Sequence, residues 1–267
     1  EKGKARLNQV GAKTGTVLIE ELEAKAMGTS FKAGGEMENA ADPKFRLDVE
    51  GDVDLAKLHA ALPIENDLFK KQSTLAGKAA VKAKASGTVK NPGFSASVVL
   101  TEASFGMPAR KINFQQINGT VAADTKSARF EKLRATVAGG KLTIDGRLDN
   151  FEKPVIAASG SLNAVNLAEV RELLGGNFST FPKELDFSGR ADVDVGLSGS
   201  ATEPKMNGTA VMAGARLSHP AVMRPLTQIV GPIKFDNKTI NTQGLQMSWG
   251  SSTVKLVGKI EDLANFK

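Results

Sequence analysis

The sequence contains no cysteine and no tyrosine, and it has one tryptophan and two histidines among 267 residues. Without cysteine, disulfide bonds and thiolate chemistry are excluded. No apolar run approaches the roughly 18 residues that a membrane-spanning helix needs. Because the chain begins with Glu1 and shows no signal peptide, we expect it to be a segment of a longer protein. Any membrane anchor is then expected outside this chain.

What is present points to β-structure. Apolar residues make up 41% of the chain and are mostly Ala, Val, Leu and Ile, and there are 27 glycines. Small and β-branched residues suit a pleated, half-buried sheet, and glycine suits turns and bulges. The net charge is +6, but Lys and Arg are interleaved with acidic residues rather than clustered beside aromatics. This pattern argues against a nucleic-acid partner.

An internal repeat runs through the chain at a spacing of 112 residues. When 73–150 is aligned on 185–262 without a gap, about 17 of 78 positions are identical, roughly three times the number expected by chance. The start of the chain joins the pattern, since Leu55-Ala56 matches Leu167-Ala168. We therefore divide the chain into a partial unit at 1–72, a full unit at 73–184 and a truncated unit at 185–267. These units are expected to form one continuous domain.

Apolar and polar residues alternate over much of each unit, which predicts antiparallel strands with one apolar face and one solvent-exposed polar face. Thr209, Val211, Ala213, Ala215 and Leu217 are interpreted as one such face. Hairpin tips are expected at 124–126 and at their mates 236–238. Two short helices are predicted, one per unit. The first is expected at about 54–62 with Asp54 as its N-cap, and the second at 167–174 after Asn166, ending at Gly175-Gly176.

The residues that might carry chemistry are not repeated. His59 is matched by Arg171, and His219 is matched by Met107. Asp192 and Asp194 are expected on the solvent-exposed face of a strand, and their repeat mates are Ala80 and Lys82. No spacing typical of a metal site or a nucleophile is present. We therefore predict no catalytic residues, no metal site and no cofactor.

The apolar strand faces are the candidate functional surface. Closed against one another they would be an ordinary core, and in an open sheet they would line a lipid-sized groove; the residues leave both readings open. The candidate lining residues are Val81, Val193, Val195, Leu197, Val211, Leu217, Leu245, Met247, Val254 and Leu256.

The arrangement of motifs resembles the C-terminal region of the AsmA family, which is related to TamB-type bacterial envelope proteins. Ser-Gly and a following Pro open a strand twice (Ser86-Gly87 with Pro92, Ser198-Gly199 with Pro204). A closing segment recurs as 146–149 and 258–261. A Pro then leads to an alternating run that ends in Leu-Ala, from Pro43 to Leu55-Ala56 and from Pro154 to Leu167-Ala168.

This resemblance implies an elongated, curved antiparallel sheet that forms an open β-groove, in the periplasmic part of a protein anchored in the inner membrane. It implies a non-enzymatic role in outer-membrane biogenesis, with phospholipid or another lipid bound or conducted in the groove. The alternative is a structural scaffold whose sheet edges recruit envelope proteins by strand addition.

Overall fold

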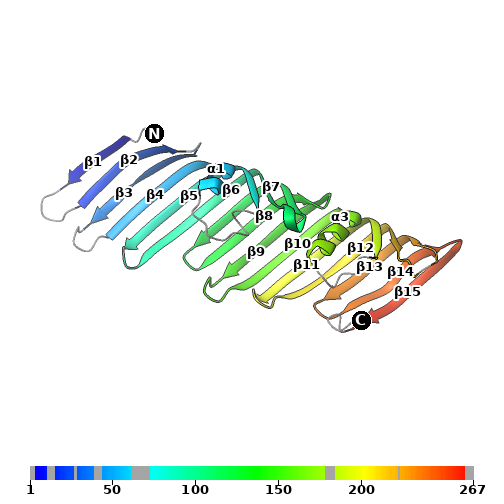
Figure 1. The fold of residues 1–267 in the computed structure, drawn as a ribbon. Helices are drawn as coiled ribbons and strands as arrows, with labels where there is room; N and C mark the ends of the chain where they lie inside the picture. The colour runs from blue at the N-terminus through cyan, green and yellow to red at the C-terminus, as the bar shows by residue number, and fades with distance from the viewer. Residues whose placement is uncertain are drawn as a thin grey trace. The chain divides into compact units, whose positions relative to one another are not determined.

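The computed structural model describes residues 4–10, 16–26, 29–38, 44–61, 73–177, 184–221 and 223–261. Within these ranges the chain forms strands joined by tight turns, with two α-helices and one short 3-10 helix (Figure 1). The elements are β1 (Lys4–Val10), β2 (Thr16–Ala26), β3 (Thr29–Glu38), β4 (Lys44–Asp54), α1 (Leu55–Ala61), β5 (Thr74–Thr88), β6 (Pro92–Met107), η1 (Pro108–Arg110), β7 (Ile112–Asp124), β8 (Ser127–Val137), β9 (Gly140–Asp149), β10 (Val155–Asn166), α3 (Leu167–Asn177), β11 (Asp186–Ser200), β12 (Lys205–Ser218), β13 (Leu226–Asp236), β14 (Ile240–Trp249) and β15 (Ser252–Ile260).

The strands follow one another in the sheet in the same order as in the chain. From β1 to β5 and from β9 to β15, each strand pairs antiparallel with the next. The mostly-β fold class, the open antiparallel sheet and the short helices predicted from the sequence are confirmed.

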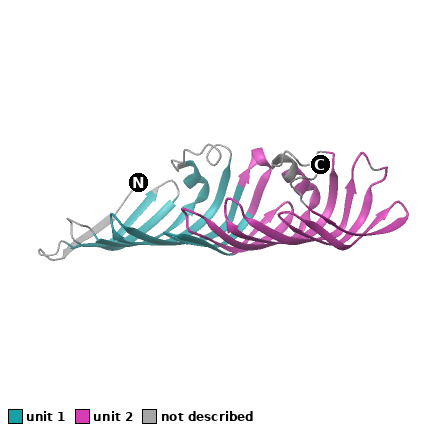
Figure 2. Cartoon of the chain, turned by 90° about the horizontal axis from the view of Figure 1, so that it is seen from below, with its two compact units in different colours: residues 1–105, 116–131 teal, residues 106–115, 132–267 magenta. Residues whose placement is uncertain are grey.

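Contacts divide the chain into two compact units (Figure 2). Unit 1 comprises Glu1–Phe105 and Gln116–Glu131, and unit 2 comprises Gly106–Gln115 and Lys132–Lys267. These boundaries follow packing, whereas 1–72, 73–184 and 185–267 follow the sequence repeat. The repeat division therefore stays a description of the sequence, and the two compact units are described separately below.

The repeat is visible at the two hairpin tips. At the tip between β7 and β8, Asp124 Oδ1 accepts hydrogen bonds from the backbone N–H groups of Lys126 and Ser127, both at 2.7 Å. At the tip between β13 and β14, Asp236 Oδ1 accepts the same bonds from Lys238 and Thr239, at 2.7 and 2.8 Å. In each tip the hydroxyl at the last of these positions also donates to Oδ2. The same side-chain turn therefore forms in both copies.

These bonds predict a pH dependence at the tips. The amide of Lys126, then the amide and hydroxyl of Ser127, hold the pKa of Asp124 below its ordinary value of 3.8, and the pKa of Asp236 is lowered in the same way. The stabilisation is fully present above the pKa of the unfolded chain and is lost as the pH falls through the lower, folded value. An NMR titration of the carboxyl carbons should give midpoints below 3.8 at both residues. Ser127→Ala should raise only the Asp124 midpoint, and a midpoint at or above 3.8 in the intact chain would contradict the prediction.

Backbone irregularities recur at the repeat spacing as well. Gln116 and Gln228 both have a φ of 52°, in the left-handed region that few side chains adopt. Gly77 and its mate Gly189 have φ values of 103° and 107°. The register between β11 and β12 shifts beside Gly189, as expected for a β-bulge.

Both helices begin where the sequence predicts. Asp54 Oδ1 accepts from the N–H groups of Ala56 and Lys57, each at 3.1 Å, and Asn166 Oδ1 accepts from Ala168 N–H at 3.0 Å. The predicted end of α3 at Gly175-Gly176 is wrong, because the helix continues to Asn177. Glycine weakens a helix by about 1 kcal/mol relative to alanine without forbidding it. The predicted end of the first helix at Leu62, before Pro63, lies outside the described residues.

Candidate functional site

Helix α3 covers one end of the strands of unit 2. Leu167 from α3 and Val165 from β10 pack into a cluster whose members are each at most 8% exposed. The other members come from strands β11 to β14 and are Ala191, Ala215, Ile229, Leu245 and Met247. We call this side of the strands the helix-bearing face. Its covered end is an ordinary hydrophobic core.

Beyond α3 the same face carries a continuous apolar row across seven strands. Ile144 lies opposite Gly160, Gly160 opposite Val195, and Val195 opposite Gly208. Gly208 in turn lies opposite Phe235, and the row ends at Ile240 and Ile260. Directly opposed residues of antiparallel strands point to the same face of the sheet. We call these residues the apolar row: Ile144, Gly160, Val195, Gly208, Phe235, Ile240 and Ile260.

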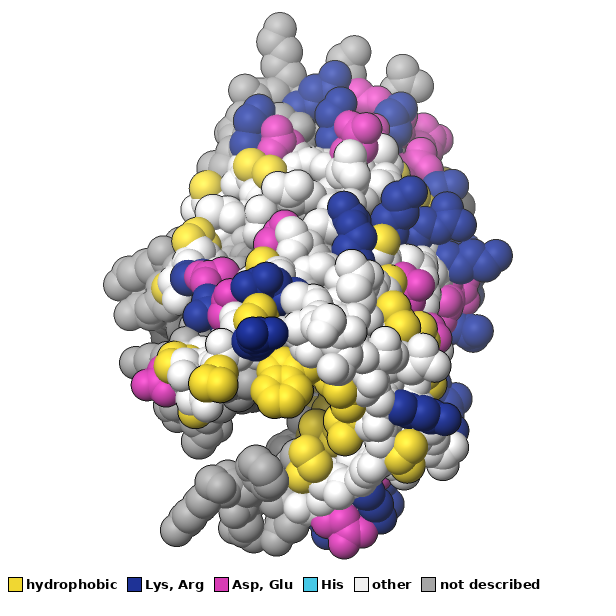
Figure 3. Space-filling model, turned by 90° about the vertical axis from the view of Figure 1, so that its right-hand side faces the viewer, with side chains coloured by type: hydrophobic (Ala, Val, Ile, Leu, Met, Phe, Trp, Pro, Cys, Tyr) yellow, Lys and Arg dark blue, Asp and Glu magenta, His cyan; other side chains and the backbone are white. Residues whose placement is uncertain are grey.

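No member of the apolar row is buried. Six of the seven are partly exposed, and Ile260 is 39% exposed. Viewed from the side of unit 2 on which β15 lies, hydrophobic side chains gather around a hollow, with many charged side chains along the margin (Figure 3). An apolar surface left open to solvent in this way is typical of a binding surface.

Two glycines shape the row. A Cβ at Gly208 would lie 2.5 Å from the ring of Phe235, so the ring rests over the strand at this point. Gly160 has no side chain between Ile144 and Val195, whose nearest atoms would lie 3.5 and 3.9 Å from a Cβ there. The Phe235 ring therefore fills the space over Gly208, whereas Gly160 leaves a shallow gap between the side chains of Ile144 and Val195.

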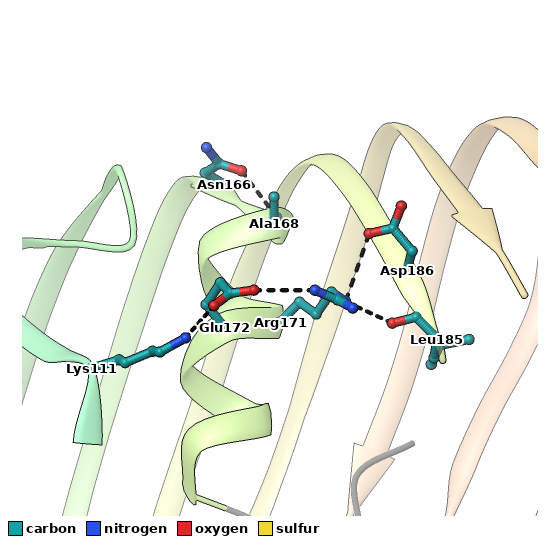
Figure 4. A network of polar contacts seen from close by, with 7 residues as sticks. All are labelled: Lys111, Asn166, Ala168, Arg171, Glu172, Leu185 and Asp186. Atoms are coloured by element: carbon teal, nitrogen blue, oxygen red, sulfur yellow. Dashed lines mark hydrogen bonds and ion pairs between the residues drawn. The ribbon is translucent and has the colours of Figure 1, made fainter. Parts of the chain in front are cut away.

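A polar network anchors α3 over the start of β11 (Figure 4). Arg171 Nε donates to the carbonyl of Leu185 at 2.7 Å and lies 3.7 Å from Asp186 Oδ1. Arg171 also donates to Glu172 at 3.1 Å, and Glu172 accepts from Lys111. The ammonium of Lys111, followed by the charge of Arg171, holds the pKa of the Glu172 carboxyl below its usual value. These bonds tie α3 to the start of β11 and, through Lys111, to the segment after η1.

His59 occupies the equivalent place in unit 1. Its Nε2 lies 3.2 Å from the hydroxyl of Ser73, just before β5. Its mate Arg171 contacts Leu185, which is the mate of Ser73 and lies just before β11. His59 therefore takes the position of a helix-anchoring residue. His219 accepts from Ala221 N–H at 3.2 Å and lies 3.6 Å from Glu184.

The ten sequence candidates fall into five groups. Val195 belongs to the apolar row, and Leu197 lies beside it on β11. Val193 and Leu217 pack against the core under α3, and Val81 packs against the corresponding core of unit 1. Val254 and Leu256 share the helix-bearing face from β15 and are 36% and 47% exposed. The remaining candidates are discussed next.

The predicted facing of Val211 is wrong. Val211 lies opposite Asp192 on β11 and opposite Pro232 on β13, so it points to the face opposite α3, where it is 44% exposed. Gly214, with a φ of 71°, introduces a bulge that moves Ala215 and Leu217 onto the helix-bearing face while Val211 stays on the other. Leu245 and Met247 have the predicted facing but are packed core, at 7% and 5% exposure.

Sequence reasoning missed Ile144, Phe235 and Ile240. Ile144 and Phe235 belong to alternating runs, but alternation alone does not say which residues of different strands stand in one row. That information comes from register, which the bulges shift.

In unit 1 the helix-bearing face has its own core of Val53, Leu55, Ala79 and Ala103 under α1. Further along, Leu47 lies opposite Ala85 and Val49 opposite Ala83, all partly exposed.

The opposite face of unit 1 carries charges of alternating sign. Lys32 lies 2.9 Å from Glu23, and Lys84 lies 3.3 Å from Asp48. Glu23, then Glu21, raises the pKa of Lys32. A groove of about 910 Å³ lies over this ladder, bordered by Lys32, Glu50 and Lys82 among others. Its charges are of both signs and exposed, which makes it a solvated surface, and the apolar row is the stronger candidate site.

The described residues contain neither a membrane-spanning helix nor a metal site. Neither α-helix has the length and hydrophobicity to cross a membrane. No three His, Asp or Glu residues in the described ranges are grouped so that they could hold a metal ion.

No family model, curated protein or solved structure matches the chain.

Proposed function

We propose that this chain is a non-enzymatic, periplasmic segment of an AsmA-like protein that binds or conducts lipid along the apolar row for outer-membrane biogenesis. The observation that carries the proposal is the row itself, which runs across seven strands and stays partly exposed. The proposed lipid ligand, the periplasmic location and the role in outer-membrane biogenesis come from the sequence resemblance to the AsmA family.

The energetics support an acyl chain as the ligand. Each methylene group removed from water contributes roughly 0.8 kcal/mol, so a chain lying along several strands would gain several kcal/mol without any specific polar contact. The row contains no charged side chain, and Gly160 leaves room between the branched side chains of Ile144 and Val195. A continuous strip of this kind accommodates a ligand that slides.

Photo-crosslinking from two neighbouring strands tests the proposal. A photoreactive amino acid is placed at Val195 on the apolar row or at Val211 on the opposite face, and the purified chain is mixed with phospholipid vesicles. We expect acyl chains to be labelled from position 195 and not from 211. Mass spectrometry of the adducts identifies the lipid. Equal labelling from both positions, or none from 195, would contradict the proposal.

The alternative is a scaffold that recruits envelope proteins through its sheet edges. It is favoured by one observation, the exposure of β15, where Leu256 and Val257 are 47% and 64% exposed. A scaffold predicts recovery of a protein partner without lipid labelling at Val195, so the same crosslinking experiment separates the two functions.

A further inference from the structure

The space next to the Cβ position of Gly258, on β15, is empty of described atoms. The repeat mate of Gly258 is Gly146 on β9, where the next strand approaches closely: a Cβ at Gly146 would lie 2.6 Å from the Cβ of Ala158 and 2.9 Å from its Cα. A Cβ at Gly258 would meet nothing within 4 Å. Glycine is required at 146 because β10 packs there, whereas nothing described in the structure requires it at 258.

The apolar side chains around Gly258 are likewise more exposed than their repeat mates around Gly146. On β9, Leu142, Ile144 and Leu148 are partly buried beside β10. Their mates on β15 are Val254, Leu256 and Ile260, which are 36%, 47% and 39% exposed. Among the described residues only β14 pairs with β15, so the second edge of β15 has no described pairing partner. Such an edge is a template for strand addition.

We infer that this edge of β15 is an acceptor site for an uncharged strand with the apolar pattern of β10. The β9–β10 register fixes the expected pairing. Ala158 lies opposite Gly146, so the corresponding alanine of the partner takes the space at Gly258. Ile156 lies opposite Leu148 and Leu162 opposite Leu142, so a large residue is expected two positions before that alanine and four positions after it, facing Ile260 and Val254.

The chemistry of the partner follows from that register. It is an extended segment that alternates Ile, Ala, Gly and Leu on one face with uncharged, mostly small residues on the other, as in 155–163. It carries no charge, and it meets the exposed apolar side of β15 on the helix-bearing face. This inference does not depend on lipid binding, and its test contains no lipid.

The experiment uses the whole 267-residue chain and a labelled synthetic peptide of residues 154–166. We expect the peptide to bind and a scrambled peptide of the same composition not to bind. Replacing Ala158 by valine in the peptide should weaken binding at least about tenfold, because the added methyl groups clash with the strand at Gly258. This variant lies in the peptide, so the folding of the chain is unaffected.

Two chain variants test the same contact from the other side. Gly258→Val fills the space and should also weaken binding at least about tenfold. Lys259→Val is the matched control, because the equivalent position 147 on β9 holds an arginine opposite Ala157 without obstructing β10. It should leave binding within about twofold, because Lys259 pairs with the exposed Glu261, a contact that the peptide does not use.

Disulfide trapping checks the register. The chain has no cysteine, so one can be introduced at Val257 or Lys255 and paired with a peptide carrying Ser159→Cys. Ser159 lies opposite Asp145, the mate of Val257, so Val257→Cys should crosslink and Lys255→Cys should not. The inference is overturned if the peptide fails to bind, if the scrambled peptide binds equally, or if the 255 crosslink dominates. It is also overturned if β15 pairs with a second copy of the chain, seen as a chain–chain disulfide that the peptide does not prevent.

Discussion

Replacing Gly189 by alanine is expected to lower the free energy of unfolding of unit 2 by about 3 kcal/mol, from backbone strain and overpacking together. Gly189 has a φ of 107°, which residues other than glycine rarely adopt. A Cβ there would also lie 2.7 Å from the Cα of Ala215, a backbone atom that cannot turn aside. Ala215 is 3% exposed and belongs to the core under α3, so the clash cannot be relieved into solvent.

Two other glycines of unit 2 separate the causes. Gly214 has a φ of 71° but nothing within 4 Å of its Cβ position, so Gly214→Ala should cost only the backbone strain, about 1 kcal/mol. Gly258 has neither a positive φ nor a neighbour, so Gly258→Ala should be neutral or stabilise by up to about 1 kcal/mol through the unfolded state.

Trp249 makes the comparison measurable. It is the only tryptophan and lies on β14 in unit 2, so its fluorescence during urea unfolding reports on that unit. The expected order of unfolding midpoints is Gly258→Ala, Gly214→Ala and then Gly189→Ala, from highest to lowest. If Gly189→Ala were as stable as Gly258→Ala, the tight packing of β11 on β12 would be contradicted.

Replacing Val195 by aspartate is expected to reduce lipid binding by the chain at least about tenfold, because an ionised carboxylate in an apolar ligand contact loses its hydration. Val195 lies in the middle of the apolar row, between Gly160 and Gly208. It is only partly buried, so the folded chain should tolerate the carboxylate when no lipid is present.

Val211→Asp is the matched control for this prediction. It introduces the same charge on the neighbouring strand, but on the opposite face beside Asp192. Vesicle co-sedimentation of both variants should show a large loss for Val195→Asp and a change below about twofold for Val211→Asp, whose carboxylate stays in water. Equal losses would mean that charge in general, rather than the apolar row, governs binding.

Local chemistry was predictable from the sequence where it depends on residues close together in the chain. At Asp124 and Asp236 the side-chain carboxylate accepts hydrogen bonds from backbone N–H groups two and three positions ahead. The caps at Asp54 and Asn166 likewise accept from backbone N–H groups just ahead of them. Repetition of these patterns 112 residues apart made them more reliable than either copy alone.

The facing of Val211 was not predictable, because alternation keeps its parity only while a strand is regular. The bulge at Gly214 changes that parity, and the equivalent residue in the first copy is Glu102, which also has a positive φ of 48° without being glycine. A bulge that need not contain glycine leaves no dependable sequence signal. Which residues form a row across several strands is therefore not predictable past each bulge.

The sequential strand order has a consequence for how the chain folds. Each strand of this sheet follows its neighbour directly in the sequence, so hairpins can close one after another without bringing distant segments together. Contacts of short sequence separation favour rapid folding, and repeated units of this type can nucleate at any copy and propagate from it. A shortened chain that ends at a strand boundary should therefore lose only its terminal pairing and keep the structure of the strands before it.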